Sequence, residues 1–281
     1  MYLGLTFVHV PFRTSEHAPD VDWDSFLGFG HGEMTLGELM SLDSAKVVHL
    51  PPRRLDTQRA VEELSHMVSR TRHRDDLVFH QGRGVYLGVS LEQSSLMPSV
   101  YRQKYLHARS RSPRPPLTPE SNLHVGVHVR RGDVAALMGA GDARAEMRWI
   151  DLGYYTHILR RLRDSAPCDV TLHILTDGTE QEVDDLRLFD HCLVHATGDP
   201  RDAFHAMTQV DVLISGTSAF SLTAGKIATG VKLVRRSWDR HDYRLHLPRT
   251  SDWMDVDGNW TAAAVWEAAA RHRVERLRRR A

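Results

Sequence analysis

Cysteine is scarce in this sequence, and the two that occur are not arranged for a metal site or a disulfide framework. Cys168 and Cys192 are the only cysteines among 281 residues, and no Cys-x-x-Cys motif is present. A disulfide-held secreted scaffold and a cysteine-based zinc site are therefore excluded. The composition suits a reducing compartment, and we predict no metal site.

Long apolar runs and an excess of either charge are also missing. No apolar stretch approaches the ~20 residues of a membrane span, so no stable membrane insertion is expected. The first residues, MYLGLTFVHVPF, lack a basic segment before a long apolar core, which predicts no signal peptide and a cytoplasmic location. Basic and acidic residues balance at 36 each, so no global field recruits nucleic acid, and any phosphate binding must be local.

The sequence does have a core-forming composition and a clear internal boundary. Hydrophobic residues make up 41% and charged residues 26% of the chain, as in folded proteins. The segment 109–121, RSRSPRPPLTPES, holds four prolines and few apolar residues, which is typical of an inter-domain linker. We predict an N-terminal α/β domain over residues 1–110 and a second domain over residues 120–281.

The N-terminal half contains short apolar segments separated by polar ones. Apolar runs favour strands at Leu5–Val10, Ala45–Leu50 and Asp76–His80, and helical spacing favours helices at about 56–70 and 99–108. The segment between the first two strands carries acidic residues and several glycines, and we interpret it as a loop.

The C-terminal half alternates strictly between strand and helix patterns. We predict strands at Leu123–Val129, Val170–Thr176, Cys192–Ala196, Val210–Ser215 and Val231–Val234, with helices at about 152–164, 180–189, 200–208, 219–229 and 261–280. Such alternation with short loops is typical of a doubly wound parallel sheet that has helices on both faces.

Two arginines follow directly after the first strand of this half. In open parallel sheets ligands bind at the carboxyl ends of the strands, where Arg130 and Arg131 are expected. A guanidinium matches phosphate oxygens two at a time. Because side chains alternate along a strand, His128 and Arg130 should point one way and Arg131 the other. One arginine can then meet an anionic ligand while its neighbour anchors the loop.

Two other interpretations of these arginines remain open. The pair can serve only in salt bridges at the strand end, with Asp133 as a partner. Alternatively, Arg131-Gly132-Asp133 is the tripeptide of cell-adhesion ligands, and that role requires an exposed, flexible loop.

Two further strand ends carry polar groups. Asp177 and Thr179 follow the strand 170–176, and they can bond a ribose or cap the next helix. The turn Ser215–Ser221 is rich in hydroxyls and leads into a helix. Free N–H groups at a helix start bind anions, although an ordinary serine or threonine cap explains the turn equally well.

Taken together, these motifs resemble a known family. HVRRGD (128–133) resembles the first motif of the GDP-fucose-dependent fucosyltransferases of the α1,2, α1,6 and protein O-fucosyl groups. DAFHAMTQVDVLISGTSAFS (202–221) is similar to their later motif, and DLGYYTHIL (151–159) to the helix after the arginine loop of the α1,2 group. The resemblance covers roughly residues 123–234.

The resemblance implies a GT-B-like architecture of two Rossmann-like domains, in which residues 120–281 hold the donor. It also implies metal-independent, inverting transfer of fucose from GDP-fucose to a glycan or protein acceptor. Arg130 would clamp the diphosphate, His128 would contact the nucleotide or phosphate, and Asp202 would recognise guanine. The predicted donor-binding residues are His128, Arg130, Arg131, Asp177, Asp202, Ser218, Ala219 and Phe220.

The catalytic base is not marked by a motif. Besides Arg130, which would stabilise the departing GDP, Asp142 and Glu146 in the loop after the arginines are the candidates for catalysis, and each can instead be a solvated loop charge. The late turn has Ala219 where the family often has a second serine, and Leu222-Thr223 where the α1,2 group carries tryptophans. These departures leave the acceptor subgroup open.

The N-terminal domain departs further from the family. Family members begin with a strand and a glycine-rich loop that this sequence does not show, so we predict an incomplete acceptor-side domain. His9, Arg13, His17 and residues 20–24 are candidates for its acceptor side, with core or solvent roles as the alternative. A non-catalytic nucleotide-sugar-binding remnant of the same family is therefore the second functional hypothesis.

Overall fold

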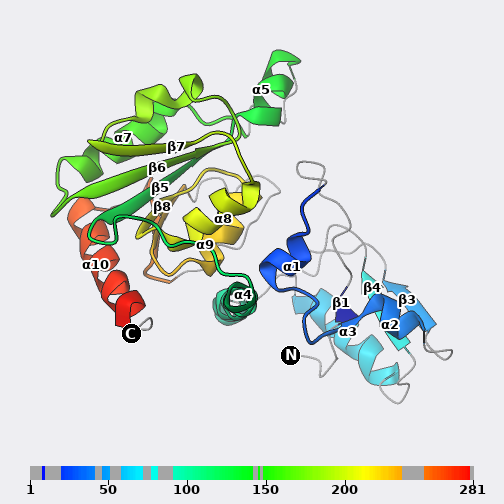
Figure 1. The fold of residues 1–281 in the computed structure, drawn as a ribbon. Coiled ribbons are helices and arrows are strands. Elements are labelled where there is room, and N and C mark those ends of the chain that lie inside the picture. The colour runs from blue at the N-terminus through cyan, green and yellow to red at the C-terminus, as the bar shows by residue number, and fades with distance from the viewer. Residues whose placement is uncertain are drawn as a thin grey trace. The chain divides into compact units, whose positions relative to one another are not determined.

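The chain forms two compact units in a computed structural model, which describes residues 8–9, 20–41, 46–50, 58–71, 77–81, 91–141, 145, 148–235 and 250–278 (Figure 1). One unit comprises Met1–Leu96 and Gln103–Arg111, and the other comprises Met97–Arg102 and Ser112–Ala281. The long stretch of the second unit begins inside the proline-rich segment 109–121.

The first unit is built from short elements. Strand β1 (Val8–His9) pairs in parallel with β2 (Met34–Thr35), and β3 (Lys46–Leu50) pairs in parallel with β4 (Leu77–Gln81). The helices are α1 (Trp23–Leu27), α2 (Leu36–Met40), α3 (Gln58–Thr71) and α4 (Leu91–Arg111), the last of which contributes to both units. The strands near residues 45–50 and 76–80 and the helix near 56–70 lie close to their predicted bounds.

The prediction of a loop between the first two strands was wrong for part of that segment. Helix α1 begins where the Asp22 side chain accepts a hydrogen bond from the backbone of Ser25. Helix α2 begins with a capping box between Thr35 and Glu38. These caps satisfy backbone N–H groups that would otherwise have no partner in the helix. Local capping therefore produces two short helices in a glycine-rich segment.

The second unit contains a six-stranded parallel sheet of order β7-β6-β5-β8-β9-β10. The strands are β5 (Leu123–Val129), β6 (Val170–Thr176), β7 (His191–His195), β8 (Val212–Ile214), β9 (Val231–Val234) and β10 (Trp253–Asp255). The chain runs outward from β5 to β7 and then returns to pair β8 with the other side of β5. This order is compatible with a Rossmann-like fold, and it puts the topological switch point between β5 and β8.

Helices cover both faces of this sheet, as predicted (Figure 1). Helices α7 (Leu152–Arg163) and α10 (Ala262–Arg278) pack on one face with the 3-10 helix η1 (Gln181–Leu186), where Val125, Val127 and Val129 join their core. Helices α8 (Pro200–Gln209) and α9 (Ala219–Ile227) cover the other face, the one that His128 points toward.

Three elements of the second unit differ from the sequence prediction. Helix α5 (Gly132–Gly139) occupies a predicted loop, because the residues between its terminal glycines favour helix. The predicted helix at 180–189 is the shorter η1, in which Val183 and Leu186 are buried three residues apart, the period of a 3-10 helix. Strand β10 was not predicted. No helix in the described ranges is long and apolar enough to cross a membrane.

Three histidines form a hydrogen-bonded row across β5, β6 and β7. His124 Nδ1 lies 2.9 Å from His173 Nε2, and His173 Nδ1 lies 3.1 Å from His195 Nε2. His124 Nε2 faces the carbonyl oxygen of Pro119 at 3.2 Å. The Pro119 oxygen can only accept, so His124 Nε2 donates to it. If the rings are neutral, His173 Nε2 then donates to His124 Nδ1, and His195 Nε2 donates to His173 Nδ1. Burial lowers the pKa of His124 and that of His195. It also lowers the pKa of His173, to about 3.

We expect this row to make the fold sensitive to acid. The unfolded chain binds protons near the ordinary histidine pKa of about 6.5, whereas the folded row stays neutral below it. The unfolded state then binds more protons, so the free energy of unfolding decreases as the pH is lowered, by about 1.4 kcal/mol per pH unit for each such histidine. Urea denaturation at several pH values below neutrality measures the slope. His173→Leu should flatten it by one histidine, and identical slopes in both chains would contradict this account.

Candidate functional site

The two motifs that the sequence singles out meet at the switch point of the sheet. Strands β5 and β8 are paired, with Val127 opposite Ile214. The rings of His128, from the end of β5, and Phe220, from the first turn of α9, have centroids 5.7 Å apart. A Cβ atom on Gly216, after β8, would lie 3.7 Å from the His128 carbonyl oxygen. The arginine loop and the serine-rich turn are therefore neighbours in space.

Two carboxylates hold the Arg130 side chain at the carboxyl end of β5. Its Nη2 donates to Asp133 Oδ1 at 2.6 Å, and its Nη1 lies 3.7 Å from Asp177 Oδ2. The side chain is 20% exposed. These contacts hold the guanidinium at the carboxyl ends of β5 and β6, and they are also the salt bridges that a purely structural role would require.

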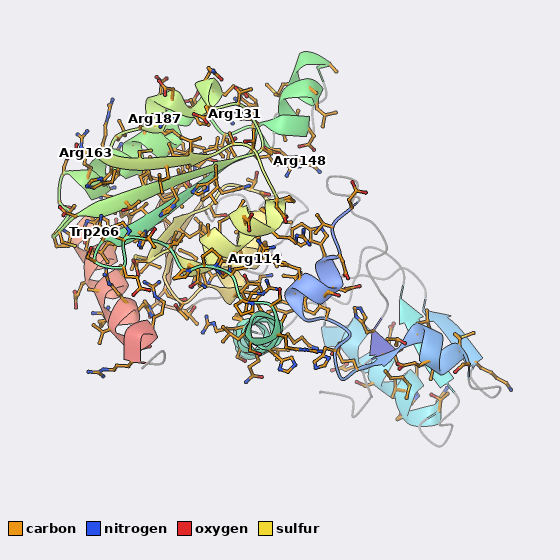
Figure 2. All side chains as sticks on the ribbon, in the orientation of Figure 1. Arg114, Arg131, Arg148, Arg163, Arg187 and Trp266 are labelled. Carbon is orange, nitrogen blue, oxygen red and sulfur yellow. The ribbon has the colours of Figure 1, made fainter. Side chains whose placement is uncertain are left out.

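Arg131, labelled in Figure 2, is the anchor of the loop. It is 2% exposed, its Nη2 donates to the Ile150 carbonyl oxygen at 3.1 Å, and its guanidinium stacks 4.0 Å above the Trp149 ring. Burial lowers the pKa of Arg131. The tripeptide that it begins is thus not presented as an adhesion loop. Its part in donor binding stays a prediction.

Asp177 braces the same loop. Its Oδ1 accepts a 2.6 Å hydrogen bond from the backbone N–H of Arg131. The loop after β5 and the loop after β6 can come this close only because both carry a glycine. A Cβ on Gly132 would lie 2.8 Å from Asp177 Oδ2, and a Cβ on Gly178 would lie 2.6 Å from Arg131 Cβ. Asp177 therefore links the carboxyl ends of β5 and β6. It does not cap η1, which was another role predicted for it.

His128 is buried in the site with an unused nitrogen. It is 4% exposed, and its Nδ1 has no hydrogen-bond partner among the described residues. Burial lowers the pKa of His128 to about 4, against a smaller opposing effect of Asp177. The imidazole is therefore neutral near pH 7. Buried polar atoms in folded proteins are almost always hydrogen-bonded, so an unpaired one beside a switch point is consistent with a ligand partner.

The hydroxyls of the serine-rich turn are divided between two roles. Ser215 Oγ and Ser221 Oγ lie 2.8 Å apart and are buried, and Ser221 Oγ donates to the Ser218 carbonyl oxygen. These two hydroxyls hold the turn together. Ser218 is the N-cap of α9, but its side chain makes no capping hydrogen bond. The first-turn N–H groups of α9 are thus not capped by Ser218, an arrangement suited to an anion.

Asp202 lies in the first turn of α8 and is paired with the linker. Its carboxylate contacts the guanidinium of Arg114, which also lies 3.7 Å from Asp199. Asp199 caps α8 through the backbone N–H of Arg201. The predicted guanine-reading residue is therefore engaged by Arg114 in this structure.

The structure describes some of the other predicted residues and not the rest. Asp142, Glu146, Arg13 and His17 lie outside the described residues. His9 is described in the first unit, where it is buried with its Nε2 3.3 Å from Asp24 Oδ1. Ala219 and Phe220 form the start of α9.

The prediction from sequence missed Tyr155, whose hydroxyl lies at the switch point. Its burial was predictable, because Tyr155, Ile158 and Leu159 follow helical spacing in DLGYYTHIL. Trp149, which carries the Arg131 guanidinium, was also missed.

Comparisons with models of known protein families and with curated proteins found no match. Within the described residues, no group of three or more His, Cys, Asp or Glu side chains is arranged to hold a metal ion.

Proposed function

We propose that the protein is a glycosyltransferase that transfers fucose from GDP-fucose to a glycan or protein acceptor with inversion. The observation that supports this proposal is the contact between His128, two residues before Arg130, and Phe220 in the first turn of α9, at the switch point between β5 and β8. Open parallel sheets of this strand order bind nucleotides in that crevice.

The chemistry of the site supports the proposal. Breaking a glycosyl–phosphate bond builds negative charge on the departing phosphate, and a preorganised cation opposes that charge. A guanidinium has five N–H donors, so the contacts of Arg130 with Asp133 and Asp177 leave donors for phosphate oxygens. The first-turn N–H groups of α9 would share the diphosphate. Because these groups are positively polarised, the protein would need no metal in this role.

The finer parts of the proposal follow the family resemblance. The second unit would hold the donor, with the neutral imidazole of His128 beside the nucleotide and Phe220 near the base or phosphates. The first unit would supply the acceptor side in a GT-B-like arrangement. Asp202 would recognise guanine only after exchanging its contact with Arg114 for the base.

Turnover of GDP-fucose tests this function directly. The native chain is incubated with GDP-fucose and a glycan array, and fucose transfer and GDP release are measured. We expect acceptor-dependent GDP release and fucosylated spots on the array. A remnant without transfer activity would bind GDP and release none from the donor. If the chain binds neither GDP nor GDP-fucose, both hypotheses are wrong.

A further inference from the structure

Tyr155 of α7 has a buried hydroxyl that lies beside Gly216, at the switch point of the sheet. The residue is 0% exposed. A Cβ atom on Gly216 would lie 2.9 Å from Tyr155 Oη and 3.7 Å from the carbonyl oxygen of His128. The hydroxyl is therefore next to the carboxyl end of β8, at its junction with the end of β5.

This hydroxyl has no hydrogen-bond partner among the described residues. Its surroundings include the Ile150 side chain, since the same point on Gly216 lies 3.0 Å from Ile150 Cδ1. Leaving a buried hydroxyl unpaired opposes folding, and a phenylalanine would fill the same volume without that cost. Burial raises the pKa of Tyr155, so the group stays protonated and is a donor. The free protein thus carries a donor that its own described structure does not use.

Gly216 makes this placement possible. Any side chain at position 216 would put a Cβ atom within contact distance of both Tyr155 Oη and Ile150 Cδ1. With glycine, the backbone that leads toward the start of α9 passes directly over the hydroxyl. The donor is consequently adjacent to the turn that would receive an anion.

We propose that the Tyr155 hydroxyl is a ligand-binding group, which donates a hydrogen bond to a phosphate oxygen of the bound nucleoside diphosphate, directly or through one ordered water. This inference rests on the proposed function, because that function puts a diphosphate at this switch point. Binding would supply the hydrogen-bond partner that the hydroxyl lacks among the described residues. The hydroxyl then contributes to ligand affinity, and it does not contribute to the stability of the free protein.

Tyr155→Phe separates these effects, because GDP binding should weaken while the stability of the free protein should not decrease. Calorimetric titration with GDP should show about 10-fold weaker binding, which corresponds to one lost hydrogen bond to a charged acceptor. Thermal unfolding of the free variant should occur at the same temperature as in the native chain or higher. Tyr105→Phe, a buried tyrosine of α4 in the first unit, is the matched control and should leave GDP affinity unchanged.

The outcomes distinguish this inference from the proposed function. If the native chain binds GDP and Tyr155→Phe binds it equally well, the inference about Tyr155 is wrong and the proposed function stands. A variant that binds weakly and also unfolds at a lower temperature would show a structural hydroxyl, which likewise overturns the inference. Failure of the native chain to bind GDP would remove both.

Discussion

Replacing Arg130 with alanine is expected to weaken GDP binding by about 10- to 100-fold, the loss of charge-assisted hydrogen bonds to phosphate. The physical reason is that Arg130 is the only one of the two neighbouring arginines whose guanidinium is not buried. Arg131 is committed to Ile150 and Trp149. Isothermal calorimetry with GDP measures the difference between the native chain and Arg130→Ala.

Two further variants separate phosphate binding from general charge. Arg130→Lys keeps the charge but loses the planar fork, so its affinity should fall between those of the native chain and the alanine variant. Arg163→Ala removes an exposed arginine of α7 whose partner is the adjacent Asp164, and it should leave GDP affinity unchanged (Figure 2). Equal affinity in the native chain and Arg130→Ala would end the proposal that Arg130 clamps a diphosphate.

Replacing Asp252 with alanine is expected to destabilise the second unit by about 3 kcal/mol, because it leaves a buried ammonium without its counter-charge. Lys232 lies in the middle of β9 and is 1% exposed. Its Nζ contacts the Asp252 carboxylate and the carbonyl oxygens of Ala228 and Gly230. Burial lowers the pKa of Lys232. Burial acts to raise the pKa of Asp252, but the pair with Lys232 and hydrogen bonds outweigh it, and the net shift is downward.

Urea denaturation, followed by tryptophan fluorescence, measures the loss, and Trp253 lies beside this pair. Asp164→Ala breaks an exposed ion pair and is the matched control, with an expected change within about 0.5 kcal/mol. Adding Lys232→Met to Asp252→Ala removes the stranded charge and should restore most of the stability. A single variant as stable as the native chain would show that the ion pair carries no net stabilisation.

The regular part of the fold was predictable from sequence. Strands β5, β6 and β9 have the predicted bounds, because strands of a parallel sheet are buried on both faces and are therefore rich in apolar residues. Helices α7, α8 and α9 begin within a residue of their predicted starts, where Asp151, Asp199 and Ser218 are the N-caps. Alternation of these elements was sufficient to predict a doubly wound sheet.

The features that we did not predict from the sequence are short elements and contacts between residues far apart in the chain. Lys232 reads as a charged interruption of a short strand, and only the fold brings Asp252 to it. Helix α5 was hidden because glycines at both of its ends indicate a loop. Strand β10 is three residues long and gains its pairing from β9. Short elements carry too little periodicity to be recognised without their partners.

The candidate site was predictable in its location and less so in the roles of its residues. Alternation along the strand predicted different surroundings for Arg130 and Arg131. Arg131 is buried, and the Arg130 side chain is 20% exposed at the carboxyl end of β5. The sequence did not reveal that Asp177 braces the loop, because that role requires β6 to lie beside β5. It also gave no sign that the Tyr155 hydroxyl would be buried without a hydrogen-bond partner among the described residues, because this depends on three-dimensional packing.

The central claim is that the junction of β5 and β8 receives a nucleoside diphosphate, and a crystal structure of the native chain with GDP tests it most directly. The account predicts diphosphate oxygens within hydrogen-bonding distance of the Arg130 guanidinium and of the first-turn N–H groups of α9. GDP bound at another place, with this junction unoccupied at saturating concentration, would contradict it.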